Sequence, residues 1–357
     1  MILALKISIA GQFECLPLRL REASEFQAGL SRGSWRANKN EEEHQMKANK
    51  NVLLALLAGA FGFASLAHSA QSGADSAQIP FSVPLARQAN GFMAVQARLN
   101  GVDGRFLLDS GASMTCVDRK QAARFGLENE GTTRASHGSA GATEIKRVAD
   151  KRLEWGGRLA ADKLAVYLTD FDAINQGLAE EGIAAVDGVI GMDVLAGLHA
   201  VLDYGQQQLR LRNDAKPAAA FDRLPLTSLG GEQLMVEGVV NGVKGRFIID
   251  TAADGTFVTD DAHAAKFHLA RQAGTDQVHG VGGSVESHFY LLDSLQLGPR
   301  FTLRQQKVMT MDLAGVNASL KAKGLEEVDG LLGANVLNQG AAVFNIGQQV
   351  LQLKPLI

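Results

Sequence analysis

Two aspartates follow apolar stretches in almost the same phrase. Asp109 ends "GRFLLD" and Asp250 ends "GRFIID". Each carboxylate comes after three apolar residues, at the end of an expected interior strand, where an unpartnered charge is costly. Two carboxylates held against each other cannot both ionise easily, so they share one proton. The ionised member can act as general base on a water, while the protonated member polarises or protonates a scissile carbonyl. This chemistry makes Asp109 and Asp250 the predicted catalytic pair.

The residues after each aspartate suit a turn that holds a carboxylate. Ser110 and Thr251 carry hydroxyls that can bond from one turn to the other. Gly111 lets the backbone pass close, so that amide groups point at the carboxylate. One Asp-Ser-Gly by itself is a common turn. The repetition of the whole phrase, with a second repeated motif downstream, favours a functional site.

The aspartate phrase belongs to an internal repeat. Asp109 and Asp250 are 141 positions apart, and one inserted residue before Phe267 raises the offset to 142 in the rest of the repeat. The later matches include Phe125 with Phe267, His137-Gly138 with His279-Gly280, "VDGVIGMDVL" with "VDGLLGANVL", and "AVLDYGQQQLRL" with "AVFNIGQQVLQL". The order of the matches predicts two homologous lobes, 80–214 and 222–357, joined by a linker at 215–221 that contains Pro217.

Strand patterns dominate each predicted lobe. "FMAVQARLNG" alternates and turns at Asn-Gly, a hairpin signal, and "GRFLLD" supplies the return strand. Short helices are expected after Asp118 and after Asp260 or Asp261, which are plausible N-caps. The predicted fold is therefore mainly β, with two homologous lobes related by pseudo-twofold symmetry and a few short helices.

At this point the chain resembles the pepsin/retropepsin superfamily of aspartic proteases, and most of all its bacterial retropepsin-like branch. The resemblance rests on "LLDSGAS" and "IIDTAAD", followed in register by "GVIGMDVL" and "GLLGANVL". It implies that Asp109 and Asp250 are catalytic. It also implies flaps that close over a peptide and turn residues that support the pair. The implied turn residues are Ser110, Gly111, Thr251 and Ala252, and the implied flap residues are His137, Gly138, His279, Gly280, Gly282 and Gly283.

The second lobe departs from the family pattern at two positions. Ala252 stands where the pattern has glycine, which would be strained if that residue needs a positive φ and harmless if φ is negative. Asp254 stands where the first lobe has Ser113, so a third carboxylate either raises the pKa values of the pair or faces solvent. The first flap also lacks the tyrosine common in two-lobed pepsins. These departures motivate an alternative function, a catalytically weak or inert protease-like module that binds peptides in the cell envelope.

Other candidate residues favour structural roles. Asp187 and Asp329, in the two "VDG" turns, are expected to cap those turns. The histidines lack the spacing of metal ligands, so no metal or other cofactor is expected. Cys116 in "MTCV" is expected to pack as a structural cysteine, because no basic neighbour lowers its pKa.

The N-terminal region predicts export. From Met46, two lysines precede an apolar run and then small residues, the pattern of a secretory signal peptide at 46–70. Residues 1–45 would then be an upstream extension and 71–79 an N-terminal linker. The other interpretation is a membrane anchor, for which the apolar run is short. The predicted location is therefore periplasmic or secreted, with no stable membrane insertion after signal removal.

Composition limits the partners. The formal net charge of −3 argues against a general nucleic-acid binder. The expected partner is a peptide or protein substrate, and the expected state is a monomer, because one chain supplies both aspartates. A third model, in which only the first lobe retains function within a homodimer, predicts that Asp250 is dispensable.

Overall fold

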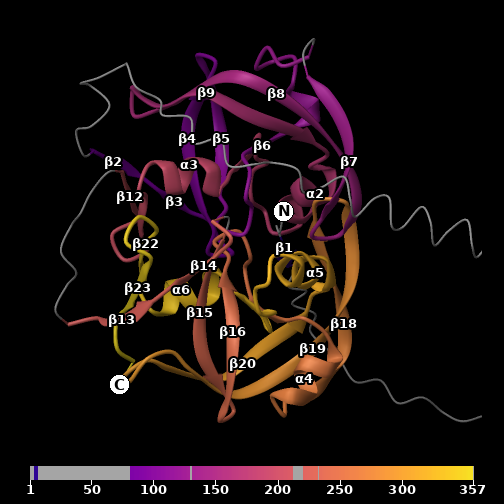
Figure 1. The fold of residues 1–357 in the computed structure, drawn as a ribbon, viewed down its shortest axis with the longest axis vertical. Coiled ribbons are helices and arrows are strands. Elements are labelled where there is room, and N and C mark those ends of the chain that lie inside the picture. The colour runs from indigo at the N-terminus through magenta and orange to yellow at the C-terminus, as the bar shows by residue number, and fades with distance from the viewer. Residues whose placement is uncertain (1–3, 7–80, 129–130, 212–219, 232, 357) are drawn as a thin grey trace, which may run out of the picture. The chain divides into compact units, whose positions relative to one another are not determined.

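The computed structural model describes residues 4–6, 81–128, 131–211, 220–231 and 233–356. The predicted signal peptide at 46–70, the linker at 71–79, residues 215–219 of the linker at 215–221 and all but three residues of the extension at 1–45 lie outside these ranges. Figure 1 shows two lobes, one drawn in indigo to magenta and the other in orange to yellow. Within the described ranges, no helix has the length and apolar character needed to cross a membrane.

The first lobe is built on an eight-stranded sheet that closes on itself, because β4 also pairs with β8. Two parallel pairings, β5 with β10 and β6 with β9, hold its centre. In sheet order the strands are β3 (Ala86–Arg87), β4 (Met93–Leu99), β5 (Val102–Leu108), β10 (Gly188–Ile190), β6 (Cys116–Asp118), β9 (Arg158–Thr169), β8 (Gly141–Trp155) and β7 (Thr132–Gly138).

The second lobe repeats this topology, with parallel pairings of β16 with β21 and of β17 with β20. A short strand, β1, is added at the edge of β18. In sheet order the strands are β1 (Ala4–Lys6), β18 (Ala270–Gly280), β19 (Gly283–Gln296), β20 (Thr302–Thr310), β17 (Thr256–Val258), β21 (Gly330–Leu332), β16 (Val243–Ile249), β15 (Gln233–Val240) and β14 (Thr227–Leu229).

A six-stranded sheet joins the two lobes, and it lies at the left in Figure 1. Its central pair is β11 with β22, in which Leu202 of the first lobe stands opposite Phe344 of the second. In order the strands are β13 (Asp222–Pro225), β23 (Val350–Leu353), β22 (Val343–Asn345), β11 (Val201–Asp203), β12 (Gln208–Leu211) and β2 (Phe81–Pro84). The lobes are therefore continuous through backbone hydrogen bonds.

The helices are short and occupy corresponding places in the two lobes. Asp118 caps η1 and Asp260 caps α4 through their side chains, which confirms the N-cap predictions. The helices are η1 (Arg119–Gln121), α2 (Asp172–Glu180), α3 (Met192–Gly197), α4 (Asp261–Lys266), α5 (Ala314–Ala322) and α6 (Ala334–Gln339).

Local sequence explains the hairpins that deliver the aspartates. Asn100 and Gly101 both adopt positive φ, 51° and 80°, and Asn241 and Gly242 do the same at 48° and 84°. Two consecutive residues of positive φ form the turn whose twist matches a tight hairpin. The return strands then run inward, where Phe106 packs on Phe125 and Phe247 packs on Phe267. The prediction of a mainly β fold with two homologous lobes is confirmed.

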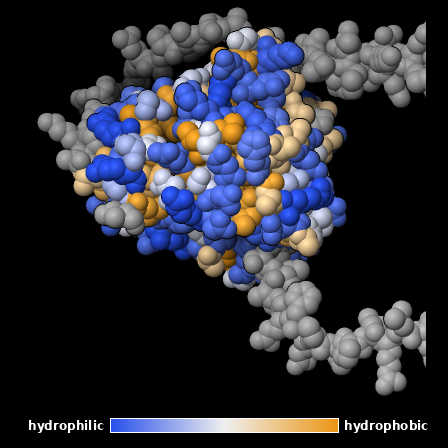
Figure 2. Space-filling view, turned by 90° about the horizontal axis from the view of Figure 1, so that it is seen from below, coloured by the Kyte–Doolittle hydropathy of each residue, from blue (hydrophilic) through white to orange (hydrophobic). Residues whose placement is uncertain are grey.

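Hydrophobic side chains fill the interior and only scatter over the surface. Three clusters of buried residues form the core of the described chain: one spans both lobes, one lies mainly in the first lobe and one lies in the second. Figure 2, seen from below the view of Figure 1, shows a mostly hydrophilic face with isolated hydrophobic residues.

Candidate active site

Each aspartate directly follows a strand, and its backbone N–H is hydrogen-bonded to the neighbouring parallel strand. Asp109 N–H donates to the carbonyl of Ile190 at 3.0 Å, and Asp250 N–H donates to that of Leu332 at 3.0 Å. The acceptors belong to β10 and β21, the apolar-apolar-Gly segments that repeat in the sequence. This explains why the downstream motif accompanies each aspartate phrase.

The turns after the two aspartates are hydrogen-bonded to each other through their hydroxyl groups. Ser110 Oγ donates to the carbonyl of Ile249 at 2.7 Å and accepts the N–H of Thr251 at 3.2 Å. Thr251 Oγ1 donates to the carbonyl of Leu108 at 2.6 Å and accepts the N–H of Ser110 at 3.0 Å. Both hydroxyls are buried and fully engaged. The predicted bonding from turn to turn is confirmed.

Amide groups of each turn hold the inner oxygen of each carboxylate. Asp109 Oδ1 accepts the N–H groups of Gly111 and Ala112, both at 2.9 Å, and Asp250 Oδ1 accepts that of Ala252 at 2.9 Å. The outer oxygens, Oδ2 of both residues, are buried and accept no hydrogen bond from the described part of the chain. The amide groups of the turns therefore engage only the inner oxygen of each carboxyl group.

Burial raises the pKa of both carboxyl groups. For Asp109 the charge of Asp250 raises the pKa further, while the amides of Ala112 and Gly111 lower it. For Asp250 the amide of Ala252 opposes the effect of burial. Both side chains are completely buried, so the two groups are electrostatically coupled in a low-dielectric site. The arrangement favours one proton on the pair over two charges.

Glycine is required at position 111 by the opposite carboxylate, not by its φ. A Cβ atom there would lie 2.4 Å from Asp250 Oδ2 and 2.6 Å from its Cγ. Ala252 does not adopt a positive φ either, so the strain considered for that residue does not occur. Its side chain lies in a buried hydrophobic cluster. Asp254 is half-buried at the end of the same turn.

A threonine and a residue at the start of a helix support each turn from behind. Thr115 donates its N–H and Oγ1–H to the carboxylate of Asp193, at 3.0 and 2.7 Å. The second lobe pairs Thr256 with Asn335 at 3.2–3.3 Å. Burial raises the pKa of Asp193, which the bonds from Thr115 partly offset. Neither pair was predicted from the sequence. Asp193 and Asn335 lie within the downstream motif that repeats, whereas Thr115 and Thr256 lie outside the quoted repeats.

The two Gly-rich hairpins are β7–β8 and β18–β19, and their tips touch. Ala140 N–H donates to the carbonyl of Val281 at 3.0 Å. A Cβ atom at Gly138 would lie 2.1 Å from Val281 O, and one at Gly282 would lie 2.5 Å from Gly141 O. The tips therefore approach backbone to backbone, which only glycine permits.

The predicted flap residues all fall on these hairpins. His137 and Gly138 end β7, while His279 and Gly280 end β18. Gly282 lies in the turn and Gly283 begins β19. The His279 side chain is buried, and its Nδ1 lies 2.8 Å from Ser284 Oγ.

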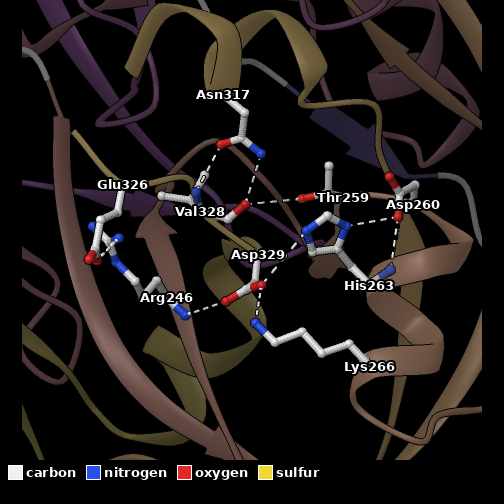
Figure 3. Close-up of polar contacts among 9 residues, drawn as sticks. All are labelled: Arg246, Thr259, Asp260, His263, Lys266, Asn317, Glu326, Val328 and Asp329. Atoms are coloured by element: carbon white, nitrogen blue, oxygen red, sulfur yellow. Dashed lines mark hydrogen bonds and ion pairs between the residues drawn. The ribbon is translucent and has the colours of Figure 1, made fainter. Parts of the chain in front are cut away.

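Asp187 and Asp329 are predicted to cap their own turns, but each carboxylate instead bonds to the backbone of a neighbouring strand. Asp187 Oδ2 accepts the N–H of Arg105 at 2.8 Å, and Asp329 Oδ2 accepts that of Arg246 at 3.0 Å. Figure 3 shows that Asp329 also accepts a hydrogen bond from Lys266. The side chain of Asn317 is hydrogen-bonded to the backbone N–H and carbonyl of the neighbouring Val328. Each carboxylate thus ties the loop before β10 or β21 to the strand that carries a catalytic candidate.

The thiol of Cys116 is fully buried beneath the first turn. Burial raises its pKa, so the thiolate needed for nucleophilic chemistry is disfavoured. The interpretation of Cys116 as a packed structural residue is confirmed.

Two β-lobes that each deliver an aspartate turn to one buried centre define a protein of the acid-protease type. The sequence matches the family model described as aspartyl protease twice, at residues 95–194 and 236–336. The first match contains Asp109 and the second contains Asp250. The chain therefore belongs to the aspartyl protease family, as the resemblance to its retropepsin-like branch implied. A comparison with curated proteins finds no significant match.

Proposed function

We propose that the protein is an exported aspartic endopeptidase that hydrolyses peptide bonds with Asp109, Asp250 and an activated water. One observation carries the proposal. Two completely buried carboxyl groups, from equivalent turns of two lobes, lie at the same centre and each keeps its outer oxygen unbonded within the described chain. Membership of the aspartyl protease family supports a hydrolase of this kind.

The raised pKa values suit general acid–base chemistry with one shared proton. The ionised carboxylate takes a proton from water as the water oxygen attacks the peptide carbonyl carbon. The protonated carboxyl group gives its proton to the carbonyl oxygen, which forms a neutral tetrahedral diol. Proton transfer to the amide nitrogen then breaks the carbon–nitrogen bond and releases acid and amine. The pair ends with one proton, as it began.

The flaps set the access to this pair. Their tips meet through Ala140 and Val281, so a peptide enters when this contact opens and is then covered when it closes. Closure excludes water from the reacting groups and strengthens their electrostatic interactions. An extended peptide fits this role because a flap presents backbone groups to its substrate.

Export to the periplasm or the medium is part of the proposal and rests on the leader pattern that begins at Met46. We further propose that the enzyme acts as a monomer, because one chain brings both carboxyl groups together. Fractionation of producing cells and light scattering of the purified protein test these two points.

The deciding experiment is cleavage of an unfolded protein from pH 3 to pH 8 by the purified chain and by its Asp109→Asn and Asp250→Asn variants. We expect a bell-shaped profile for the wild type, whose limbs belong to the pair. We expect both variants to be folded and to lose at least about 10³-fold in kcat/KM, since either removes a group that moves the proton. Circular dichroism checks the fold.

Three other outcomes have distinct meanings. Wild-type protein that is inactive at every pH would favour the inert peptide-binding module. Loss of activity in the Asp109→Asn variant alone would favour a homodimer of first lobes. A flat profile from acid to neutral pH would contradict the shared proton.

A further inference from the structure

A cavity of about 700 Å³ lies on the second-lobe side of the aspartate pair. It is bounded by the β19 side of the second flap, by α5 and the loop before it, and by the residues that begin α4. The tip of the first flap, Gly138–Gly141, covers one side of it. Its volume is within the range of ligand pockets.

The cavity is directly connected to the first catalytic turn. Ser113, four positions after Asp109, belongs to its lining, as does Gln233. Gln233 is only 8% exposed, and its Nε2 donates to the carbonyl of Gly111 at 2.7 Å. A nearly buried glutamine side chain therefore lines the cavity and is bonded to the turn that carries Asp109.

The corresponding place in the first lobe is filled by larger side chains. There, aromatic and branched residues at the equivalent positions are completely buried in one hydrophobic cluster. The second-lobe residues that line the cavity are smaller or polar. The pairs, first lobe then second, are Phe92 and Gln233, Phe171 and Leu313, and Ile174 and Val316.

The flap tips increase this difference. Val281, at the tip of the second flap, is buried in the cluster of the first lobe. Its counterpart Ser139, at the tip of the first flap, lines the cavity of the second lobe. Equivalent places in the two lobes therefore differ: hydrophobic side chains fill the one in the first lobe, and a cavity occupies the one in the second lobe. The cavity has room for a substrate side chain.

The lining of the cavity combines apolar walls with an acidic edge. Leu313, Val316 and other aliphatic side chains form the walls. Glu286 and Asp312 are exposed at the edge, and neither forms an ion pair with a described residue. Glu286 accepts only Thr275 Oγ1, and Asp312 accepts the N–H of Ala314.

The other charged groups at the cavity are mostly engaged. Asp260 binds His263, as Figure 3 shows, and Asp261 binds His288, Tyr290 and Arg271. Lys323 is the one lysine in the lining. In the first lobe, arginine (Arg119) replaces Asp261 and lysine (Lys146) replaces His288. The first lobe is therefore more basic than the second at these two positions.

We propose that this cavity binds a lysine or arginine side chain of the substrate next to the scissile bond, and that Glu286 and Asp312 select the cationic head. The apolar walls would accommodate the aliphatic stem, because long cationic side chains bury their stems and keep their heads near water. The inference rests on the proposed protease function and adds its substrate class.

The test uses peptides that are identical except for one position, which carries lysine or norleucine. Norleucine keeps an apolar stem and lacks the charge. The variable position is moved along the peptide, and cleavage sites are located by mass spectrometry. We expect wild-type kcat/KM to favour lysine about tenfold at one position, with a decrease at high salt. In the Glu286→Gln/Asp312→Asn variant we expect this ratio to fall below about twofold.

Equivalent carboxylates of the first lobe supply the control. Glu144 and Asp170 occupy the positions of Glu286 and Asp312, and Asp170 accepts the N–H of Asp172 as Asp312 accepts that of Ala314. The Glu144→Gln/Asp170→Asn variant should keep the wild-type lysine preference. Equal cleavage of both peptides, a preference for norleucine, or the same loss in the control variant would overturn the proposal.

Failure of the protease proposal is distinguished by binding. If neither peptide is cleaved, fluorescence anisotropy with labelled peptides on the Asp109→Asn chain still reports on the cavity. Tighter binding of the lysine peptide that is lost on adding Glu286→Gln and Asp312→Asn supports the site without catalysis. Equal binding of the two peptides refutes it.

Discussion

At Gly111 an added Cβ would lie 2.4 Å from Asp250 Oδ2, whereas the equivalent Ala252 carries its Cβ inside a buried hydrophobic cluster. The hydroxyl bonds between the turns are nevertheless reciprocal. The two turns thus share their reciprocal hydroxyl bonds but not their packing. Alanine in place of glycine is therefore expected to disturb the turn of the first lobe, although the second lobe carries alanine at the equivalent position.

Among substitutions that leave both aspartates in place, the largest effect is expected from exchanging these two residues. Gly111→Ala should displace the Asp250 carboxylate and lower kcat/KM by on the order of 10²-fold or more, because misplacement by about 1 Å costs that much. Ala252→Gly is the matched control and should change kcat/KM by less than about threefold. Steady-state kinetics on a peptide substrate provide the measurement. Comparable losses in both variants would mean that the turns are equivalent after all.

A second comparison concerns the free energy of unfolding of wild type and of the aspartate variants. Both carboxyl groups have a pKa raised by burial, so the folded protein holds protons that the unfolded chain releases. Wild-type stability should therefore fall as the pH rises from about 4, the ordinary carboxyl value, through the raised values. Asn does not titrate, so Asp250→Asn and Asp109→Asn should each exceed wild type at pH 8 by about 1–3 kcal/mol.

Urea unfolding at pH 4 and pH 8 measures this difference, and the gap should shrink at the lower pH. The exposed Asp162→Asn substitution controls for loss of one negative charge. A gap that grows toward acid pH would have the opposite sign and would mean that the carboxylates are stabilised in the fold. A gain from only one of the two variants would show that the turns differ in electrostatics as well as in packing.

The smallest effect is expected behind the turns, where the first lobe has Asp193 and the second has Asn335. Asp193→Asn should change the free energy of unfolding by less than about 1 kcal/mol at pH 7, because one bond to Thr115 is lost while a buried carboxylate is removed. The reciprocal Asn335→Asp places a carboxylate beside Thr256 and should be the more destabilising. Thermal or urea unfolding of both variants ranks them. A loss of several kcal/mol in Asp193→Asn would show that the charge itself is needed.

Much of the site could be predicted from sequence because repetition aligns it. The positions of Asp109 and Asp250, the hydroxyl exchange and the two Gly-rich hairpins follow from phrases that recur at a nearly constant offset. The reason for glycine at 111 could not be predicted, because it depends on the opposite lobe and not on local backbone conformation. Gln233 also had no local signal. Its bond to Gly111 becomes visible only when β15 is placed beside the first aspartate turn, and its small size only when it is compared with Phe92.

The cavity was missed for the same physical reason. A difference between Phe171 and Leu313 is a conservative exchange of apolar residues in the sequence, and each alone predicts a core position. Volume becomes informative only when several exchanges converge on one place in space. Repetition in the sequence reveals what the two halves share, whereas substrate preference is expected where they differ.

The sheet that joins the lobes has a kinetic consequence. Leu202 and Phe344 are paired across β11 and β22, although they lie far apart in the chain, with most of the second lobe between them. Pairings between such distant segments form slowly, because closing a long loop costs conformational entropy before any contact compensates for it. Either half folded alone holds one aspartate turn without its partner. On the proposed function, proteolytic capacity therefore arises only when the two halves dock, later than the folding of either one.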